Sequence, residues 1–210
     1  MTSRERALTA FALETPDRVP RNYLANPGID GRLKTHFGLK ADDSEGLRQA
    51  LGVDFRSVAP EYVGPKLHAD VVDRQVDMWG IHRRWIAHET GGYWDFCDFP
   101  LQHATLEEIE KWPLPSPDDF DYASAAEQCE RWAGYCITTG SPGVGDIINS
   151  TSMIRTMEQV LVDLMLDEPA CLCYVDRKTD IQLEMMERTL EAAGGSIDVL
   201  WLGEDLGTQR

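Results

Sequence analysis

Basic residues are scarce in this chain. Its 210 residues include 20 lysines and arginines against 36 aspartates and glutamates, so the formal net charge is -16. Nucleic-acid binding depends on a basic patch, and an acidic surface is repelled by anionic lipids. We therefore expect neither a nucleic-acid partner nor a membrane partner.

Long apolar runs are also missing. No stretch approaches the about 20 consecutive apolar residues that cross a bilayer, and residues 1–6 lack the apolar core of a signal peptide. The composition, 42% apolar and 27% charged, is typical of a globular protein with one sizeable core. The expected location is the cytoplasm.

Cysteine is too irregularly spaced for a disulfide framework. The five cysteines are an odd number, which fits reduced thiols. Cys171 and Cys173 form the one close pair, but residues two apart on a helix point in different directions. Zinc pairs are usually separated by two to four residues, so no metal site is expected within these residues.

Helices and strands alternate along the chain, which predicts an α/β fold. Capping boxes, in which a threonine and a glutamate three residues later satisfy each other's free amides, predict helix starts at Thr2 and Thr105. Further helices are predicted at 29–37, 44–51, 122–132, 153–164 and 169–193, and strands at 53–58, 135–139 and 197–202. Long helices between strands favour parallel β/α units. Residues 64–93, where charged and β-branched side chains alternate, predict a β-hairpin excursion.

Two carboxylates follow the last predicted strand, which we expect to be buried. Glu204 and Asp205 should emerge at its carboxyl end, where α/β enzymes place their sites. In an apolar mouth, one of them could have a raised pKa and act as a proton donor. The alternative is that an acid and a glycine after the strand form a turn and cap the next helix. The pattern leaves both interpretations open.

Charged residues also accompany the first predicted strand. Asp54 and Arg56 alternate with apolar residues, so we expect them to form a structural ion pair. Glu61 and Tyr62 follow this strand in a loop, where a substrate would be met. Glu61 is therefore a candidate catalytic acid and Tyr62 a candidate substrate contact, although a solvated loop glutamate is equally ordinary.

A glycine-rich loop covers residues 140–146. It lacks the Lys-Ser/Thr ending of a P-loop and the glycine spacing of a dinucleotide fold, so nucleotide binding is not expected. Its glycines are expected to let the loop bend closely over a pocket. Asp146 at its end and Gln209 near the end of the sequence are further candidate substrate contacts.

Several short stretches resemble those of the uroporphyrinogen decarboxylase superfamily. They are RER at 4–6, PDRVP at 16–20, LGVDF at 51–55, GSP at 140–142 and GEDLGTQ at 203–209. The resemblance implies a (β/α)8 barrel with its site at the carboxyl ends of the strands. We then expect the 210 residues to be the N-terminal part of one such barrel, with a helical lead-in over 1–52 and β/α units over 53–210.

The resemblance implies one branch of that family over the other. Decarboxylases carry an Arg-Gln-Ala-Gly-Arg stretch that holds the porphyrinogen carboxylates, whereas residues 23–28 contain no arginine. The family's catalytic aspartate falls near Glu61, which keeps a carboxylate, and its loop tyrosine falls near Ile148, which does not keep the hydroxyl. The ending at 203–207 is similar to the methyltransferase-type branch. That branch uses zinc, held by residues beyond this sequence, to activate a thiol for methyl transfer from a corrinoid.

Three functions remain as expectations. The first is zinc-dependent, corrinoid-linked methyl transfer by the full-length protein, with Glu61, Glu204 and Asp205 at the barrel mouth and a small molecule or a corrinoid protein as substrate. The second is decarboxylation of uroporphyrinogen in porphyrin biosynthesis. The third is a non-catalytic module that binds a partner or forms a homodimer through an open sheet edge. The 210 residues alone are expected to be inactive.

Overall fold

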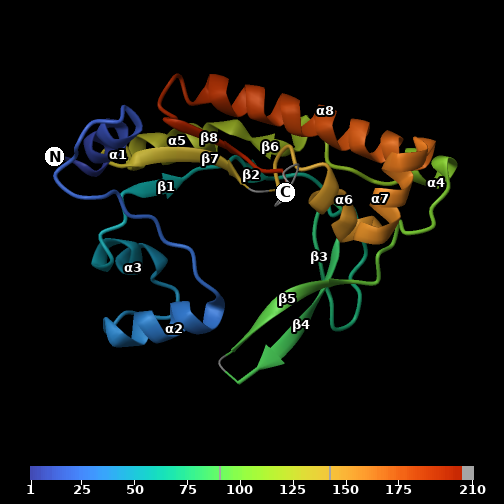
Figure 1. Cartoon of the computed structure of the whole chain (residues 1–210), viewed down its shortest axis with the longest axis horizontal. Coiled ribbons are helices and arrows are strands. Elements are labelled where there is room, and N and C mark those ends of the chain that lie inside the picture. Colours follow the sequence, from blue (N-terminus) through green and yellow to red (C-terminus); the bar gives the residue numbers. More distant parts are fainter. Residues whose placement is uncertain (90, 142, 205–210) are drawn as a thin grey trace.

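The computed structural model describes residues 1–89, 91–141 and 143–204 and has a mixed α/β fold. Its central sheet has three parallel strands in the order β1 (Phe55–Ser57), β7 (Cys136–Ser141) and β8 (Val199–Leu202). Figure 1 shows the three strands side by side beneath the long helix α8. The predicted parallel β/α arrangement is therefore confirmed for the described residues.

Helices connect the strands of this sheet. α5 (Tyr122–Arg131) precedes β7, and three helices lie in the described part of the chain between β7 and β8. These are α6 (Ile148–Arg155), α7 (Met157–Leu166) and α8 (Pro169–Ala192). α8 runs along the sheet and contacts both α4 (Leu106–Glu110) and α5.

The local signals at the helix starts are confirmed. Both capping boxes form, at Thr2 before α1 (Ser3–Phe11) and at Thr105 before α4. Asp43 caps α3 (Ser44–Ala50) by accepting a hydrogen bond from the Gly46 amide. The remaining N-terminal helix, α2 (Pro27–His36), begins with proline in its first turn, where a missing amide hydrogen has no consequence.

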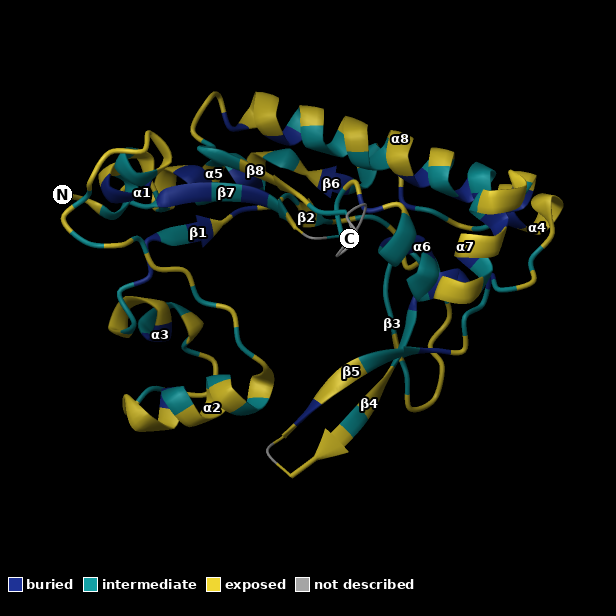
Figure 2. Cartoon of the chain, in the orientation of Figure 1, coloured by how far each residue is buried: buried dark blue, intermediate teal, exposed yellow. Residues whose placement is uncertain are grey.

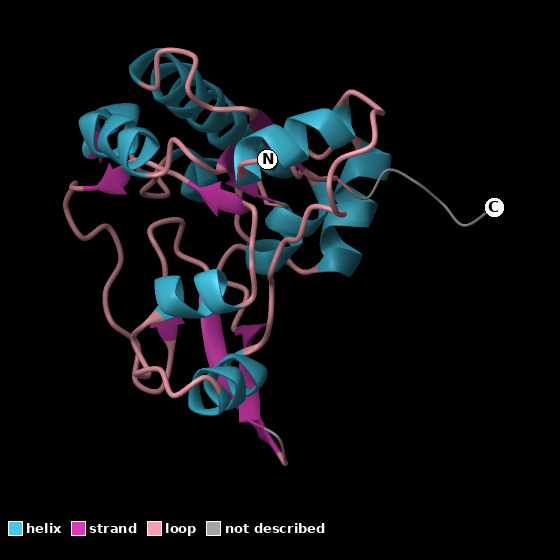
Figure 3. Cartoon of the chain, turned by 90° about the vertical axis from the view of Figure 1, so that its left-hand side faces the viewer, coloured by secondary structure: helices cyan, strands magenta, loops and turns pink. Residues whose placement is uncertain are grey.

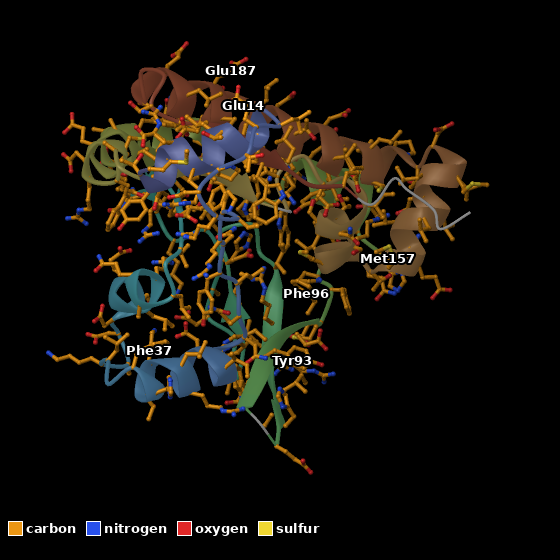
Figure 4. All side chains as sticks on the ribbon, turned by 60° about the vertical axis from the view of Figure 1, so that its left-hand side comes forward. Glu14, Phe37, Tyr93, Phe96, Met157 and Glu187 are labelled. Atoms are coloured by element: carbon orange, nitrogen blue, oxygen red, sulfur yellow. The ribbon has the colours of Figure 1, made fainter. Side chains whose placement is uncertain are left out.

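The predicted β-hairpin excursion is confirmed. β4 (His82–His88) pairs antiparallel with β5 (Gly91–Cys97), and the short β3 (Gln75–Val76) pairs with β4. Figures 1 and 3 both show this hairpin projecting away from the central sheet, beside α2. In Figure 4, Phe96 lies nearer the main body than Tyr93 does. A second small sheet joins β2 (Glu61–Tyr62) to β6 (Phe120–Asp121), which follows the single-turn helix η1 (Pro117–Asp119).

Among the residues that the structure describes, the buried apolar side chains form two clusters. The first packs the base of the hairpin against α4, α6 and α8. Its buried members are Ile81, Leu101, Ile109, Ile154, Ala170 and Tyr174. The second packs β1 and β7 against α5 and the end of α8, through Val58, Cys129, Ile137 and Ala193. Figure 2 shows this burial along β7 and the inner side of α8, whereas most of the hairpin surface is exposed.

The single helix predicted over 153–164 is wrong. The chain breaks at Thr156, whose backbone has φ 70°, and α6 ends where α7 begins. The Thr156 hydroxyl accepts a hydrogen bond from the Gln159 amide at 3.3 Å and so caps α7. Apolar residues keep helical spacing across this break, which is why periodicity alone predicted one continuous helix.

The expectation that the strand before Glu204 is buried is also wrong. β8 is parallel to β7 as predicted, but Leu200, Trp201 and Leu202 are 41%, 44% and 58% exposed. Within the described residues β8 has a neighbour on one side only, so its apolar side chains remain uncovered. Among those same residues, no helix has both the length and the apolar character needed to cross a membrane.

The predicted pairing of Asp54 with Arg56 is wrong as well. Asp54 is fully buried and pairs with Arg6 and Arg18, each with a shortest N–O distance of 2.7 Å. Arg56 instead forms a bidentate ion pair with Glu45, with N–O distances of 2.7 and 2.9 Å. Its guanidinium also stacks 3.8 Å from the centre of the Tyr135 ring. The three ion pairs join residues 48, 36 and 11 positions apart in sequence, which strand alternation does not reveal.

Candidate functional site

A cavity of about 420 Å³ lies at the carboxyl ends of β1 and β7. α8 forms one wall through Lys178, Gln182 and Met185, and the segment before β4 forms another through Asp77 and Trp79. Most of the remaining lining is apolar, including Val58, Ile81, Phe120, Met153 and Met186. This is the edge of a parallel sheet at which α/β proteins bind their ligands.

Gly140 shapes the sheet edge at this cavity. Its φ of 88° is a conformation that residues with side chains rarely adopt. A Cβ atom at this position would lie 2.2 Å from the carbonyl oxygen of Trp201 in β8. Glycine therefore allows β7 to turn toward the cavity while it remains paired with β8. This close approach is to the neighbouring strand, so the expectation that glycines let the 140–146 loop bend closely over a pocket stays a prediction.

Lys178 is the buried cation of the cavity. It is only 5% exposed, although it lines the cavity wall. Across residues 1–89, 91–141 and 143–204, no hydrogen bond or ion pair holds its Nζ atom, which lies 5.5 Å from the centre of the Trp79 ring. An ammonium group in this position has lost most of its water without gaining a carboxylate partner.

Two carboxylates lie near Lys178 but are committed to other donors. Asp77 Oδ1 accepts hydrogen bonds from the Trp79 and Ile81 amides at 3.0 Å each, and its Oδ2 pairs with Arg83 at 2.8 Å. Asp146 is buried and accepts from the Asn149 amide at 2.8 Å. Their charges therefore act on Lys178 without a direct bond.

Burial lowers the pKa of Lys178 to about 8, and attraction to Asp77 and Asp146 offsets part of that effect. At pH 7 roughly one amine in ten is then neutral, compared with a far smaller fraction for an ordinary lysine. The site thus holds a cationic hydrogen-bond donor that loses its proton within about one pH unit of neutrality. Such an amine can bind an anion, act as a base or act as a nucleophile.

Glu204 caps a helix. Its carboxylate accepts hydrogen bonds from the Ile147 amide at 2.5 Å and the Ile148 amide at 3.4 Å, at the first turn of α6. A negative charge at a helix amino terminus is stabilised by the free amides and the helix dipole. The sequence left open a proton donor or a cap on the next helix, but the helix that Glu204 contacts is α6, which precedes β8 in the chain. Asp205 and Gln209 lie outside the described residues.

Glu61 and Tyr62 lie in β2, beside the cavity. Glu61 is exposed, and its amide donates to the Ser124 hydroxyl at 3.0 Å. The Tyr62 hydroxyl donates to the Pro65 carbonyl at 2.7 Å, and its ring packs 5.2 Å from that of Phe120, which lines the cavity. None of Glu61, Tyr62 and Asp146 is among the lining residues. Asp146 is the described candidate that lies near Lys178.

Lys178 was missed by the sequence interpretation, although a signal for it exists. In α8, Tyr174, Lys178, Met185 and Thr189 follow helical spacing along the side that faces the protein interior. A lysine within such a stripe is buried either for pairing or for chemistry, since lysine is rarely fully buried otherwise.

The described residues do not fit a zinc centre. No group of three or more histidine, cysteine, aspartate or glutamate side chains among them is arranged to hold a metal ion. Burial also raises the pKa of Cys136 and of Cys171 to about 11, which keeps both thiols protonated.

The comparisons with known proteins found no relative. No protein-family model matches the chain, and neither a search of curated proteins nor a search of solved structures gave a match. The geometry of the cavity is therefore the evidence that bears on function.

Proposed function

We propose that the cavity is the substrate site of an α/β enzyme and binds a small, mostly apolar organic molecule that carries a carboxylate. Lys178 supplies the counter-charge. The observation that carries this proposal is a 5% exposed lysine that lines the cavity without a hydrogen bond or ion pair to any described residue.

Energetics favour an anionic ligand over a neutral one. An unpaired buried ammonium carries a desolvation penalty of several kcal/mol, and a ligand carboxylate would offset much of it. A hydrogen bond between charged groups contributes about 1.5–3 kcal/mol, roughly twice the value for neutral groups. Met185, Met186 and Ile81 offer apolar surface to the rest of the ligand.

The charge around the cavity favours a ligand with one carboxylate over a polyanion. Arg83 is the other cation among the described lining residues, and it already pairs with Asp77 at 2.8 Å. An octa-anionic porphyrinogen would meet one unpaired cation and the carboxylate of Asp77. The scarcity of unpaired cations in the cavity supports the methyltransferase-type branch over uroporphyrinogen decarboxylation.

We propose the (β/α)8 barrel as the complete architecture. Three parallel strands with intervening helices, a hairpin excursion and a cavity at the strand carboxyl ends support it. Zinc, the corrinoid partner and methyl transfer stay proposals that follow from the resemblance alone. Elemental analysis and a corrinoid-dependent demethylation assay on the complete gene product test them, and both giving blank results would refute this branch. Formation of coproporphyrinogen from uroporphyrinogen would instead establish the decarboxylase.

Calorimetric titration tests the binding proposal directly. Butanoate should bind the protein at least tenfold more tightly than butanamide, a neutral molecule of similar shape, which is about 1.4 kcal/mol. Lys178→Met should abolish that difference. Lys66→Met removes a lysine that is 62% exposed and should leave it unchanged. Equal affinity for both molecules, or equal behaviour of the two variants, would refute the proposal.

As a second candidate function, we propose homodimer formation through β8. The observation that favours it is the exposed apolar edge formed by Leu200, Trp201 and Leu202. Antiparallel pairing of two β8 strands across a twofold axis would cover this edge and join two sheets into one. Sedimentation equilibrium should show a dimer that Leu202→Lys disrupts. Leu183→Lys, at an equally exposed position on α8, should not disrupt it. A monomeric wild-type protein would refute this candidate.

A further inference from the structure

We propose that Lys178 is a nucleophile that forms an imine with the carbonyl carbon of a small 2-oxo acid bound in the cavity. This inference rests on the proposed function, because the same cavity must bind the carboxylate of the substrate. It goes further by naming the substrate class and the bond that forms.

The surroundings of Lys178 leave its nitrogen available for reaction. Asp77 gives both carboxylate oxygens to other donors, and Asp146 accepts from backbone amides at the start of α6. A lysine locked in an ion pair would have its lone pair occupied by a proton and its position fixed by the partner. Lys178 has no such partner among the described residues, so no ion pair fixes its position, and its Nζ atom lies 5.5 Å from the centre of the Trp79 ring.

A neutral amine is required for the attack. Burial lowers the pKa of Lys178 to about 8, so about one molecule in ten carries a neutral amine at pH 7. For a solvated lysine with a pKa near 10.4, the neutral fraction at that pH is on the order of one in 2,500. The cavity thus raises the fraction of reactive amine by roughly two orders of magnitude.

A 2-oxo acid matches both properties of the site. Its carboxylate is attached directly to the carbonyl carbon, so an amine that attracts the carboxylate is also within reach of that carbon. Protonated Lys178 would first attract the anion, and the neutral form would then react. The apolar side chains of Met185 and Met186 suit the carbon chain beyond the carbonyl group.

The step is balanced without a redox partner. The Lys178 nitrogen attacks the carbonyl carbon, a C–N bond forms, and the carbonyl oxygen takes up a proton to give a carbinolamine. Loss of that oxygen as one water molecule leaves a protonated imine. One proton is taken from solvent for each neutral amine that reacts. The positive charge therefore stays at the nitrogen, where Asp77 and Asp146 stabilise it electrostatically.

Reductive trapping tests this inference. The protein is incubated at pH 7 with pyruvate and sodium cyanoborohydride, and the modified residue is located by peptide mass spectrometry. We expect a reduced pyruvate adduct on Lys178, formed at least tenfold faster than on the exposed Lys66 and Lys111. Lactate has the same carboxylate but a hydroxyl group in place of the ketone, and it should give no adduct.

Two variants separate this inference from the proposed function. Lys178→Arg keeps the positive charge and should still bind pyruvate in calorimetry while losing the adduct. Lys178→Met should lose both. Pyruvate that binds at Lys178 without forming an adduct there would overturn the imine and leave the proposed function intact. Absence of both binding and adduct would overturn both. Labelling of all lysines at similar rates would overturn the imine, and near-ultraviolet circular dichroism checks that the variants are folded.

Discussion

Arg6 donates a hydrogen bond of 2.7 Å from Nη1 to Oδ1 of the buried Asp54, across 48 residues of sequence. Asp54 Oδ2 accepts from Arg18 at the same distance, and Arg6 also pairs with Asp17 at 2.6 Å. The network thus ties α1 and the segment after it to the start of β1. Three of the stretches that carry the family resemblance meet at this point, so their role in this structure is to hold the N-terminal segment against the sheet.

Replacing Asp54 should strongly destabilise the protein. Asp54→Asn removes the charge that compensates Arg6 and Arg18, and breaking a buried ion pair by changing one partner costs about 3–5 kcal/mol. Urea unfolding at pH 7 measures the effect. Asp118→Asn, which breaks an exposed pair with Arg188, is the control and should change the free energy of unfolding by less than about 1 kcal/mol. Similar effects of the two substitutions would contradict the importance of the network.

The low pKa of the Asp54 carboxylate predicts that the protein loses stability in acid. Burial by itself would raise the pKa of Asp54, but hydrogen bonds from Arg18, the Arg21 amide and Arg6 outweigh it and hold the pKa at about 2. Because this value is below the unfolded value of 3.8, the stabilisation is complete above pH 3.8 and is lost as the pH falls toward 2. The contribution is on the order of 2 kcal/mol. Unfolding measured from pH 5 to pH 2 should show this loss in the wild type, with a shallower fall in Asp54→Asn.

Local features of the fold could be predicted from the sequence, whereas long-range pairing could not. The capping boxes at Thr2 and Thr105 involve residues three apart, so their geometry is determined within one helical turn. Asp54 finds its partners 36 and 48 residues away. Alternation along one strand shows that a charge is buried, but it does not identify what lies opposite.

The cavity lies at the sheet edge where the sequence predicted a site, whereas Lys178 was not predicted. The carboxyl edge of the parallel strands followed from element order, and Asp146 does lie near Lys178. Lys178 itself comes from the middle of a helix that packs over the sheet, and helix periodicity does not show that its buried side reaches a cavity. The exposure of β8 was equally hidden, because an apolar run has the same sequence whether or not a second strand covers it.

The break between α6 and α7 should depend on another buried pair. Arg155 Nε pairs with Asp163 Oδ2 at 2.5 Å, and Arg155 also donates to the Leu101 carbonyl at 2.6 Å. Asp163→Asn should cost about 3–5 kcal/mol, since it leaves the guanidinium buried without its counter-charge. Glu107→Gln breaks the exposed pair with Lys111 and should change the free energy of unfolding by less than about 1 kcal/mol. Thermal unfolding of the two variants compares them, and a smaller loss in Asp163→Asn would contradict the prediction.

Gly140 should tolerate no side chain. In Gly140→Ala, the new Cβ atom would lie 2.2 Å from the Trp201 carbonyl oxygen in a backbone region that is itself unfavourable for alanine. We expect the free energy of unfolding to fall by about 1–3 kcal/mol, and the amides that pair β7 with β8 to exchange their hydrogens faster. Gly31→Ala is the control, because nothing lies within 4 Å of its Cβ position in α2. That change should stabilise the protein by roughly 0.5–1 kcal/mol, and a stabilised Gly140→Ala would show that the strand contact is absent.

Lys178 should make the protein less stable at neutral pH than at pH 10. Its folded pKa of about 8 lies below the unfolded value of 10.5, so between these values the unfolded chain binds more protons and stability rises with pH. Below pH 8 the fold carries the full penalty, on the order of 3 kcal/mol. Lys178→Met should therefore increase the free energy of unfolding at pH 7 and flatten its rise between pH 8 and pH 10, as measured by urea titration. Lys66→Met, at an exposed position, should keep the wild-type slope. If Lys178→Met lowered stability at pH 7, the ammonium would have to be compensated in the fold, and the argument for an incoming carboxylate would lose its basis.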